Sequence, residues 1–531
     1  MLTLPARLLS VPLAAVLVAL VPAGSAPGSV ERPPGAARPL AADLDGLWAD
    51  ARLTGAQVSA LVTDPATGEV LYEHAPGALL LPASTQKTVT AAAALDLLGP
   101  DHRFRTDVLA AGTRSGATLD GDLVLLGGGD PTLLPADLDG LAAEVADSGV
   151  RSVTGGLVAD ATRYDDVPLG PNWAWDDQAA YYSPQISALT LTTDEDYDPG
   201  TVRLTVTPGS GAGRPATVRV TPAEAPVHVT GQIRTGPAGG ERAVDVARRP
   251  GGNELVVSGS VPAGAEPGDE WIAVDRPALL AATVFATALA RHGVTLAGPV
   301  TEGPAPRGAG ALASHDSAPL STLMIPFLKL SNNGIAEHLV KEIGKVRADE
   351  GSWAAGTDQV RAFLHGSGLE DGDARQVDGS GLSRHNLLSA RRLAALLQFA
   401  RRQSWFTPWY EALPVAGDTQ RMVGGTLTNR LRGTVAEGRV HAKTGSMTGV
   451  DALTGYLERP GAGPLAFTVL VNNFAGDSPR PVIDAFVLRL AGDTSARPAA
   501  AGPADRTAGA AGAAGRTGHD WENACLTGAR C

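Results

Sequence analysis

Cysteine is almost absent from this chain of 531 residues, which has only Cys525 and Cys531, both near the C-terminus. Two cysteines are too few for a disulfide framework, so the body of the protein must fold without one, although a local disulfide in the tail is allowed. The ten histidines show no metal-ligand spacing, and no His–Cys pattern is present. The sequence therefore gives no reason to expect a metal or a cofactor.

Basic residues are in the minority, with 43 Lys and Arg against 56 Asp and Glu and a formal net charge of −13. Nucleic-acid binding depends on Lys and Arg contacts to phosphate, and no basic cluster is present, so we expect no nucleic-acid partner. Hydrophobic residues make up 44% of the chain and charged residues 19%, which is typical of a globular protein. At roughly 100–200 residues per domain, the length allows about three domains.

Long apolar runs are also rare, and the one present lies at the N-terminus, from residue 8 to residue 21 after Arg7. A basic start, an apolar run and the small residues that follow it are typical of a secretory signal peptide. A retained membrane anchor is the alternative, but the run is shorter than the about 20 residues that span a bilayer. We predict a signal peptide at 1–28, a linker at 29–41 and a secreted, extracytoplasmic mature protein.

Periodicity and turn residues divide the rest of the chain. A hairpin is predicted at 57–73, a helix opens at Ser84, and three strands and a helix follow between 440 and 490. Short β-like runs broken by Gly and Pro fill 107–271. This pattern predicts an α/β (α+β) fold in which a β/α catalytic domain carries an insertion. The tail at 492–531 is rich in Ala and Gly and is predicted to be disordered.

Ser84-x-x-Lys87 is the first motif that carries chemistry. A serine hydroxyl becomes a strong nucleophile when a base removes its proton. Residues three apart share one face of a helix, so Lys87 reaches the Ser84 hydroxyl, and a buried lysine beside another cation acts as a base through its lowered pKa. Because Ser-x-x-Lys also arises by chance, the motif needs partners.

Ser331-Asn332-Asn333 is the second motif. Ser331 is suited to relay a proton, and Asn333 to hold a substrate amide or to orient Lys87. The alternative interpretation is an N-cap for the helix that follows, a position that Ser and Asn favour.

Lys443-Thr444-Gly445-Ser446 is the third motif, on a predicted strand. Lys443 supplies positive charge for an anionic ligand group, and Gly445 lets a ligand approach the strand closely. The backbone N–H groups of Ser446 and Ser84 are suited to form an oxyanion hole. A strand that leads into a turn is the alternative, but the order of the three motifs matches the set found in β-lactamases and penicillin-binding proteins.

Longer stretches extend this match, including 127–133 (GGGDPTL), 173–177 (WAWDD), 378–384 (DGSGLSR) and 424–449. On these residues the chain resembles the class C, type-4 penicillin-binding proteins, the D-alanyl-D-alanine carboxypeptidases and endopeptidases, from about residue 42 to residue 490. The resemblance implies a serine β-lactamase/transpeptidase-like catalytic domain with two inserted domains. The implied ranges are 42–106 and 272–491 for the catalytic domain, 107–199 and 246–271 for domain II, and 200–245 for a nested β-rich domain III.

The resemblance also implies a role for each site residue. Ser84 attacks the carbonyl between two terminal D-alanines of a peptidoglycan stem peptide with Lys87 as its base, and β-lactam antibiotics acylate the same serine. Ser331, coupled to Lys443, passes a proton to the leaving D-alanine, and Asn333 orients Lys87. The implied substrate-binding residues are Thr444, Gly445 and Ser446 at the terminal carboxylate, and Asp177, Arg384 and Met447 at the stem-peptide side chain.

Several alternatives stay open at this point. Asp177 and Arg384 could form surface ion pairs instead of binding substrate, and Met447 could instead fill the hydrophobic core. A β-lactamase, a wall-associated binding protein without catalysis and a secreted esterase compete with the peptidase. The peptidase is favoured over a β-lactamase by the 243 residues between Lys87 and Ser331. It is favoured over a binding protein by the intact motifs, and over an esterase by the Lys-Thr-Gly sequence. The sequence does not choose between carboxypeptidase and endopeptidase activity.

Overall fold

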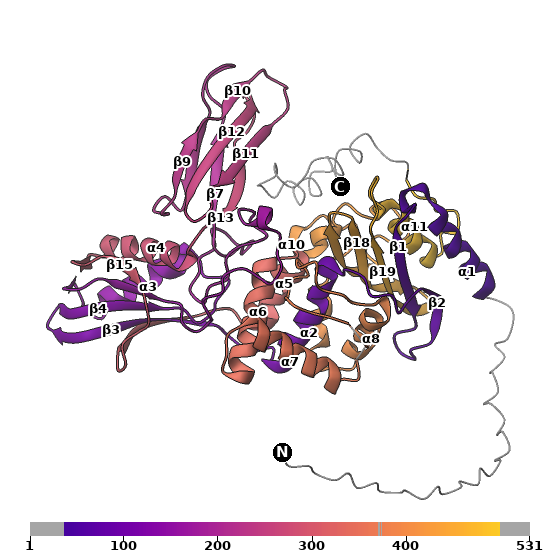
Figure 1. The fold of residues 1–531 in the computed structure, drawn as a ribbon, viewed down its shortest axis with the longest axis horizontal. Helices are drawn as coiled ribbons and strands as arrows, with labels where there is room; N and C mark the ends of the chain where they lie inside the picture. The colour runs from indigo at the N-terminus through magenta and orange to yellow at the C-terminus, as the bar shows by residue number, and fades with distance from the viewer. Residues whose placement is uncertain (1–36, 370–371, 373, 500–531) are drawn as a thin grey trace, which may run out of the picture.

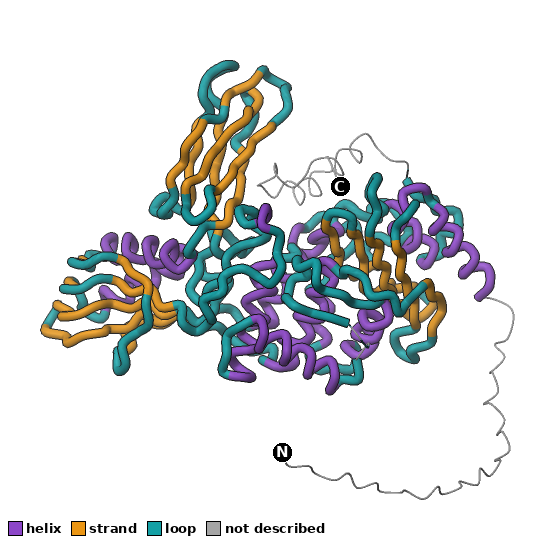
Figure 2. Tube along the Cα trace, in the orientation of Figure 1, coloured by secondary structure: helices purple, strands orange, loops and turns teal. Residues whose placement is uncertain are grey.

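The computed structural model describes residues 37–369, 372 and 374–499. The predicted signal peptide and both cysteines lie outside these residues. Figure 1 shows a helix-rich body at the right, an α/β body at the left and a β body above them. Figure 2 shows the same division by secondary structure, with the β body almost free of helix.

The helix-rich body is built on a five-stranded antiparallel sheet with the order β17-β18-β19-β1-β2. Along β18, Leu453 and Leu457 pack on one face of the sheet, whereas Ala452 and Tyr456 pack on the other. Successive side chains of a strand point to opposite faces, so a strand buried on both sides needs cover on both. The strands are β1 (Gln57–Thr63), β2 (Val70–His74), β17 (Val440–Met447), β18 (Val450–Arg459) and β19 (Ala462–Asn472).

Helices cover both faces of this sheet. Helices α1 (Ala37–Asp45) and α11 (Arg480–Leu490) share one apolar core with it, and α8 (Ala390–Ala400) lies against the other face. The predicted fold class, an antiparallel sheet flanked by helices, is therefore confirmed. The remaining helices of this body are α2 (Lys87–Leu97), α5 (Leu320–Lys329), α6 (Asn333–Ala348), α7 (Trp353–Gly366), α9 (Phe406–Glu411) and α10 (Arg421–Gly424).

The α/β body holds a seven-stranded sheet that shares a core with two helices. Strand β16 pairs with β3, and helix α4 packs in the same core, although both follow residue 272, where the catalytic domain was predicted to resume. The predicted boundary at 272 is therefore too early. It was misplaced because the apolar pattern of a helix at 277–291 does not show which body the helix packs against. The elements are β3 (Arg105–Ser115), β4 (Thr118–Leu126), α3 (Pro135–Asp147), β5 (Ser152–Val153), β6 (Leu157–Asp160), α4 (Pro277–Arg291), β14 (Thr295–Leu296), β15 (Val300–Glu302) and β16 (Gly310–Asp316).

The β body contains two small sheets. The boundary predicted at 245 falls within β11, which pairs with β12 beyond it, and β7 pairs with β13. The nested β-rich unit therefore runs to Ala273, and the prediction cut it short because strand pairing across a turn leaves little trace in the sequence. The strands are β7 (Thr201–Thr207), β8 (Thr217–Thr221), β9 (His228–Gly231), β10 (Arg234–Gly236), β11 (Ala243–Arg248), β12 (Glu254–Pro262) and β13 (Gly268–Ala273).

Two predicted boundaries at the ends of the described chain also differ from those in the structure. Helix α1 begins at Ala37, inside the predicted linker. Residues 492–499, predicted to be disordered, contact the fold, since Ala496 is buried and Arg52 Nη1 donates a hydrogen bond of 2.9 Å to the carbonyl of Ala499. Across 37–369, 372 and 374–499, no helix combines the length and the apolar character needed to span a membrane.

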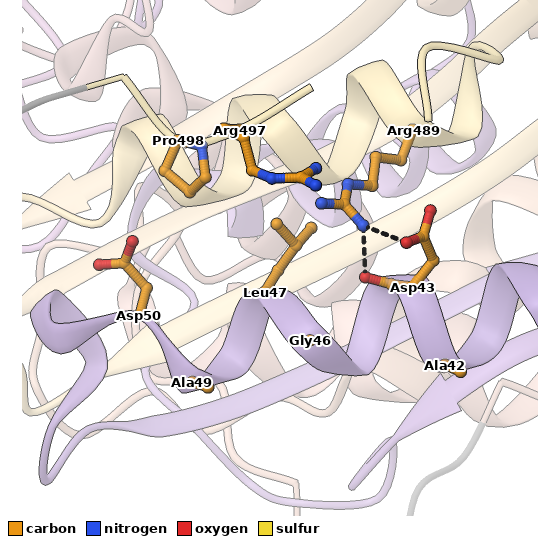
Figure 3. Close-up of a pocket in the computed structure, with 9 residues that line it drawn as sticks. All are labelled: Ala42, Asp43, Gly46, Leu47, Ala49, Asp50, Arg489, Arg497 and Pro498. Atoms are coloured by element: carbon orange, nitrogen blue, oxygen red, sulfur yellow. Dashed lines mark hydrogen bonds and ion pairs between the residues drawn. The ribbon is translucent and has the colours of Figure 1, made fainter. Parts of the chain in front are cut away.

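A hollow of about 400 Å³ lies between helix α1 and the last described residues, as Figure 3 shows. Arg489 closes one side of it, because Nη1 donates to the carbonyl of Asp43 and pairs with the carboxylate of Asp43, each at 2.7 Å. None of the predicted site residues lines this hollow.

Candidate active site

Ser84 lies in a short 3-10 helix, η3 (Ala83–Gln86), that leads directly into α2. Lys87 Nζ donates to Ser84 Oγ at 2.8 Å, so the predicted helical spacing brings the two groups into contact. Ser84 is half-buried and Lys87 is fully buried. A lysine held against a partly accessible hydroxyl is the arrangement required for a base and its nucleophile.

The backbone around Ser84 is held in an unusual conformation. Ala83 has a φ of +46°, in the left-handed region that non-glycine residues rarely adopt. Gly381 and Gly445 pack against this turn, because a Cβ atom on Gly381 would lie 1.9 Å from the carbonyl of Ala83, and one on Gly445 would lie 2.7 Å from the carbonyl of Pro82. Both positions therefore need glycine, and β17 lies directly beside the turn that carries the nucleophile.

The second and third motifs meet the first in the same place. Asn333, the first residue of α6, accepts a hydrogen bond of 2.6 Å at Oδ1 from Lys87 Nζ. Lys443 is fully buried on β17, and its Nζ donates to Ser331 Oγ at 2.8 Å. The structure thus joins Ser84, Lys87 and Asn333 in one chain of contacts and Ser331 with Lys443 in another.

The N-cap interpretation of the second motif also holds, for its middle residue. Asn332 caps α6, since its Oδ1 accepts from the backbone N–H of Ile335 at 2.9 Å. Its Nδ2 atom donates to Asp198 Oδ1 at 3.0 Å, in the segment that precedes the β body. One tripeptide therefore fixes the helix and presents Ser331 and Asn333 on either side of the cap.

A buried turn at 378–383 completes the surroundings of Lys87, although this stretch was predicted only as part of the family match and without a role of its own. Lys87 Nζ donates to the carbonyl of Ser380 at 2.9 Å. Glu337 holds this turn, because its carboxylate accepts from the backbone N–H groups of Gly379 and Ser380 at 2.9 and 2.8 Å. Burial and the nearby Asp378 carboxylate raise the pKa of Glu337, while these N–H donors oppose the rise. Glu337 and Asp378 therefore hold the backbone of this turn, since Asp378 also accepts from the N–H groups of Gly381 and Ser383 at 2.9 and 2.6 Å.

The insertion contributes a wall of the site through its backbone. Asn333 Nδ2 donates to the carbonyl of Tyr182 at 2.7 Å, which fixes the orientation of the side-chain amide. Arg421 pairs with Asp196, so the segment before the β body is also tied to helix α10. A carbonyl has no residue identity, so no sequence signal could have identified Tyr182 as a partner of Asn333.

The predicted carboxylate-binding residues lie along β17, an edge strand of the sheet. Thr444 is half-buried, and its hydroxyl donates to Thr426 Oγ1 at 2.8 Å, a partner that the sequence analysis missed. Ser446 is exposed, and its Oγ accepts from Arg480 Nη2 at 2.9 Å. Both hydroxyls lie on the strand that faces the nucleophile turn, and each has a fixed hydrogen-bond partner.

The three predicted side-chain-pocket residues also come together. Arg384 is exposed, and its Nη2 donates to the carbonyl of Thr448 at 3.0 Å, next to Met447. Asp177 accepts from the hydroxyl of Tyr182 at 2.7 Å. Burial raises the pKa of Asp177, while the Tyr182 hydrogen bond and the charge of Arg384 oppose the rise. An acid, a base and a half-buried methionine thus border one end of the site.

His441 lies two residues before Lys443, so strand alternation places both side chains on the same face of β17. Its ring stacks on Tyr410 with centroids 4.5 Å apart, and within the described chain its buried Nδ1 atom has no hydrogen-bond partner. Burial and then the charge of Lys329 lower the pKa of His441 from 6.5 to about 4. It is therefore a neutral neighbour of the site.

This lowered pKa predicts a loss of stability in acid. As the pH falls from 6.5 to about 4, His441 becomes protonated in the unfolded chain but stays neutral in the folded chain. The free energy of unfolding should fall over this window by roughly 1–2 kcal/mol from this group, allowing for its partial exposure. His441→Phe keeps a ring on Tyr410 and should lose this part of the pH dependence in urea unfolding. An unchanged pH dependence would contradict the assignment.

The described residues contain no group of three or more His, Cys, Asp and Glu side chains arranged to hold a metal ion. The groups gathered at the site are instead two serine–lysine pairs, an asparagine and a hydroxyl-lined edge strand. A serine and a lysine at a helix start, opposite Lys-Thr-Gly on the edge of an antiparallel sheet, define the class of active-site serine hydrolases that includes penicillin-binding proteins and β-lactamases.

Comparison with known proteins narrows this class to one family. Residues 40–492 match the D-Ala-D-Ala carboxypeptidase 3 (S13) family, so the chain belongs to that family. The match begins within α1 and ends just beyond α11. It therefore includes both inserted bodies as well as the catalytic sheet.

Individual relatives agree with the family. A D-alanyl-D-alanine carboxypeptidase of Actinomadura sp. (strain R39) is 46% identical over 452 residues, covering 85% of this chain and 84% of the relative. D-alanyl-D-alanine carboxypeptidase DacB of Haemophilus influenzae is 28% identical over 428 residues, covering 79% of this chain and 86% of the relative. The crystal structure of penicillin binding protein 4 (dacB) from Haemophilus influenzae matches with a TM-score of 0.73 at 26% identity, over 85% of this chain and 98% of that one.

Proposed function

We propose that this protein is a serine-type D-Ala-D-Ala peptidase that acts on peptidoglycan stem peptides through an acyl-enzyme on Ser84. The observation that carries the proposal is the contact of Lys87 Nζ with Ser84 Oγ at 2.8 Å, in a chain that belongs to a D-Ala-D-Ala carboxypeptidase family. The Actinomadura relative is named for this activity. The proposed site is built entirely from side chains and backbone groups of the chain itself.

Acylation begins with proton transfer from Ser84 to an uncharged Lys87. The Ser84 oxygen then attacks the carbonyl of the penultimate D-alanine, and the backbone N–H groups of Ser84 and Ser446 stabilise the oxyanion. Asn333 and the carbonyl of Ser380 hold Lys87 Nζ in place during the transfer, at 2.6 and 2.9 Å. Because these acceptors are fixed, Nζ stays aimed at the hydroxyl.

The leaving group departs when the bond between the carbonyl carbon and the D-alanine nitrogen breaks. Ser331 donates its hydroxyl proton to that nitrogen and is reprotonated through Lys443, which lies 2.8 Å away. Lys443, Thr444 and Ser446 bind the terminal carboxylate, and Gly445 allows the peptide to lie along β17. Water then hydrolyses the acyl-enzyme and frees Ser84.

The side chain of the stem peptide is proposed to lie against Asp177, Arg384 and Met447. Asp177 and Arg384 supply opposite charges for the ends of a diamino-acid side chain, and Met447 supplies an apolar wall. A β-lactam presents a strained amide and a carboxylate to the same groups and should acylate Ser84. One solved relative is the Haemophilus influenzae penicillin binding protein 4 in complex with a β-lactam, with a TM-score of 0.68 at 25% identity.

Location and domain limits belong to the same proposal. We place the enzyme outside the cytoplasmic membrane, where peptidoglycan lies, on the basis of the predicted signal peptide at 1–28. The strand pairings support inserted bodies that span about 105–316, with the β body at 201–273 nested inside.

Digestion of purified muropeptides with a mass-spectrometric readout tests this function. Wild-type protein should release D-alanine from pentapeptides, split cross-linked dimers, or do both, and Ser84→Ala should do neither. The first product supports carboxypeptidase activity and the second endopeptidase activity. Wild-type protein that folds, yet yields neither product, would contradict the proposal.

A further inference from the structure

Arg480 lies at the start of helix α11 and reaches the end of the edge strand β17. Its Nη2 donates to Ser446 Oγ at 2.9 Å, and its Nε donates to Asp451 Oδ1 at 3.2 Å. Ser446 and Asp451 face each other across the β17–β18 pair. The guanidinium therefore bridges two neighbouring strands at the open edge of the sheet.

Asp451 fixes Arg480 in this position. The Asp451 side chain is only 5% exposed, and its second oxygen accepts from Ser478 Oγ at 2.9 Å. A buried carboxylate with two fixed donors leaves the guanidinium little freedom to turn away. The Arg480 side chain itself stays 28% exposed, so it is held rigidly and still meets solvent at the edge of β17.

The hydrogen bond to Ser446 also sets the direction of the Ser446 hydroxyl. Since Ser446 Oγ accepts from Arg480, its single O–H is left to donate elsewhere. Strand alternation places Ser446 on the same face of β17 as Thr444 and on the opposite face from Lys443. The two contacts described use two of the five N–H donors of the guanidinium. A cation therefore lies at each face of the edge strand, Lys443 from β17 itself and Arg480 from helix α11.

The geometry points to Arg480 as a second cation of the carboxylate pocket, which selects ligands that end in a free carboxylate and orients the Ser446 hydroxyl toward them. This inference rests on the proposed function, in which Lys443, Thr444 and Ser446 bind that carboxylate. A planar guanidinium is suited to a carboxylate because it donates two parallel hydrogen bonds. Arg480 is a specificity residue in this account and takes no part in proton transfer.

Paired ligands that differ only in this charge test the inference. Acylation rates are measured with benzylpenicillin and with its methyl ester, for wild-type protein, Arg480→Gln and Arg480→Lys. Arg480→Gln should slow acylation by the free acid roughly ten- to hundredfold and change acylation by the ester much less, because only the acid carries the carboxylate. Arg480→Lys keeps the charge without the planar fork and should fall between the two. Arg361→Gln removes an exposed arginine on α7 and should leave both rates unchanged.

The outcomes separate this inference from the proposed function. Equal slowing with acid and ester would show that Arg480 acts only on the fold and would overturn the inference, as would an unchanged preference for the acid in both Arg480 variants. The proposed function fails separately, if wild-type protein is acylated by neither compound and releases no D-alanine from a D-Ala-D-Ala peptide. Urea unfolding of each variant identifies any loss of folding, and Arg480→Lys retains a test if Arg480→Gln does not fold.

Discussion

Ser84→Ala should abolish covalent labelling by a fluorescent penicillin and should lower kcat/KM for D-alanine release by roughly 10⁴-fold or more. The hydroxyl is the only group placed to form the acyl bond in this account, and Lys87 Nζ lies 2.8 Å from it. Ser84 is half-buried at the start of a well-packed helix, so alanine should fold normally there. The measurements are in-gel fluorescence and a D-alanine release assay.

Ser115→Ala is the matched control, because Ser115 is exposed on β3 in the inserted α/β body. It should label and hydrolyse like wild-type protein. Labelling of folded Ser84→Ala at the wild-type level would show that another residue carries the acyl group, and the mechanism would then be wrong.

Lys87→Gln should have the second largest effect, a fall in the acylation rate of roughly 10²–10⁴-fold. The variant retains an amide that can donate to Asn333 Oδ1 and the carbonyl of Ser380, the two other acceptors around Nζ, but it has no base. Stopped-flow acylation by a chromogenic β-lactam measures the rate, and thermal unfolding checks the fold. The pH dependence that arises from deprotonation of the base should disappear with it.

A partly exposed lysine provides the control for Lys87→Gln. Lys345→Gln removes a lysine on α6 that pairs only with Asp349 within the described chain, and it should leave acylation unchanged. A folded Lys87→Gln protein that is acylated at the wild-type rate would exclude Lys87 as the base, whatever Ser84→Ala shows.

Local patterns predicted the secondary structure around the site well. The hairpin of β1 and β2, the helix that follows Ser84 and the strands of the β17–β19 meander appear where alternation and turn residues indicate them. These elements have strong periodicity and clear stops, such as Gly99-Pro100 after α2. Sequence therefore identifies an element best where its ends carry their own signal.

Domain limits were harder because they depend on pairing between distant segments. Strand β16 completes the inserted sheet after an excursion of some two hundred residues from β3, and β13 closes on β7 in the same way. The sequence pattern of a strand does not show which sheet the strand joins. The limits taken from the resemblance and the local sequence pattern therefore fell at 245 and 272, inside or before the returning segments.

The residues with distinctive side chains were found from the sequence, and the structure brings them together. Ser84, Lys87 and Asn333 form one chain of contacts and Ser331 and Lys443 form another, and their catalytic roles stay predictions. The partners that were missed are of two kinds. The carbonyls of Ser380 and Tyr182 carry no sequence signal. Thr426 lies in the matching stretch 424–449 but was given no role there, and Arg480 lies outside the motifs and the matching stretches named above.

Peptide mapping of the wild-type protein after reaction with benzylpenicillin tests the central claim most directly. Proteolysis and tandem mass spectrometry should find one penicilloyl adduct, on the peptide that contains Ser84, with fragment ions that assign it to that serine rather than to Thr85. An adduct on Ser331 or on any other residue, with Ser84 unmodified, would contradict the account.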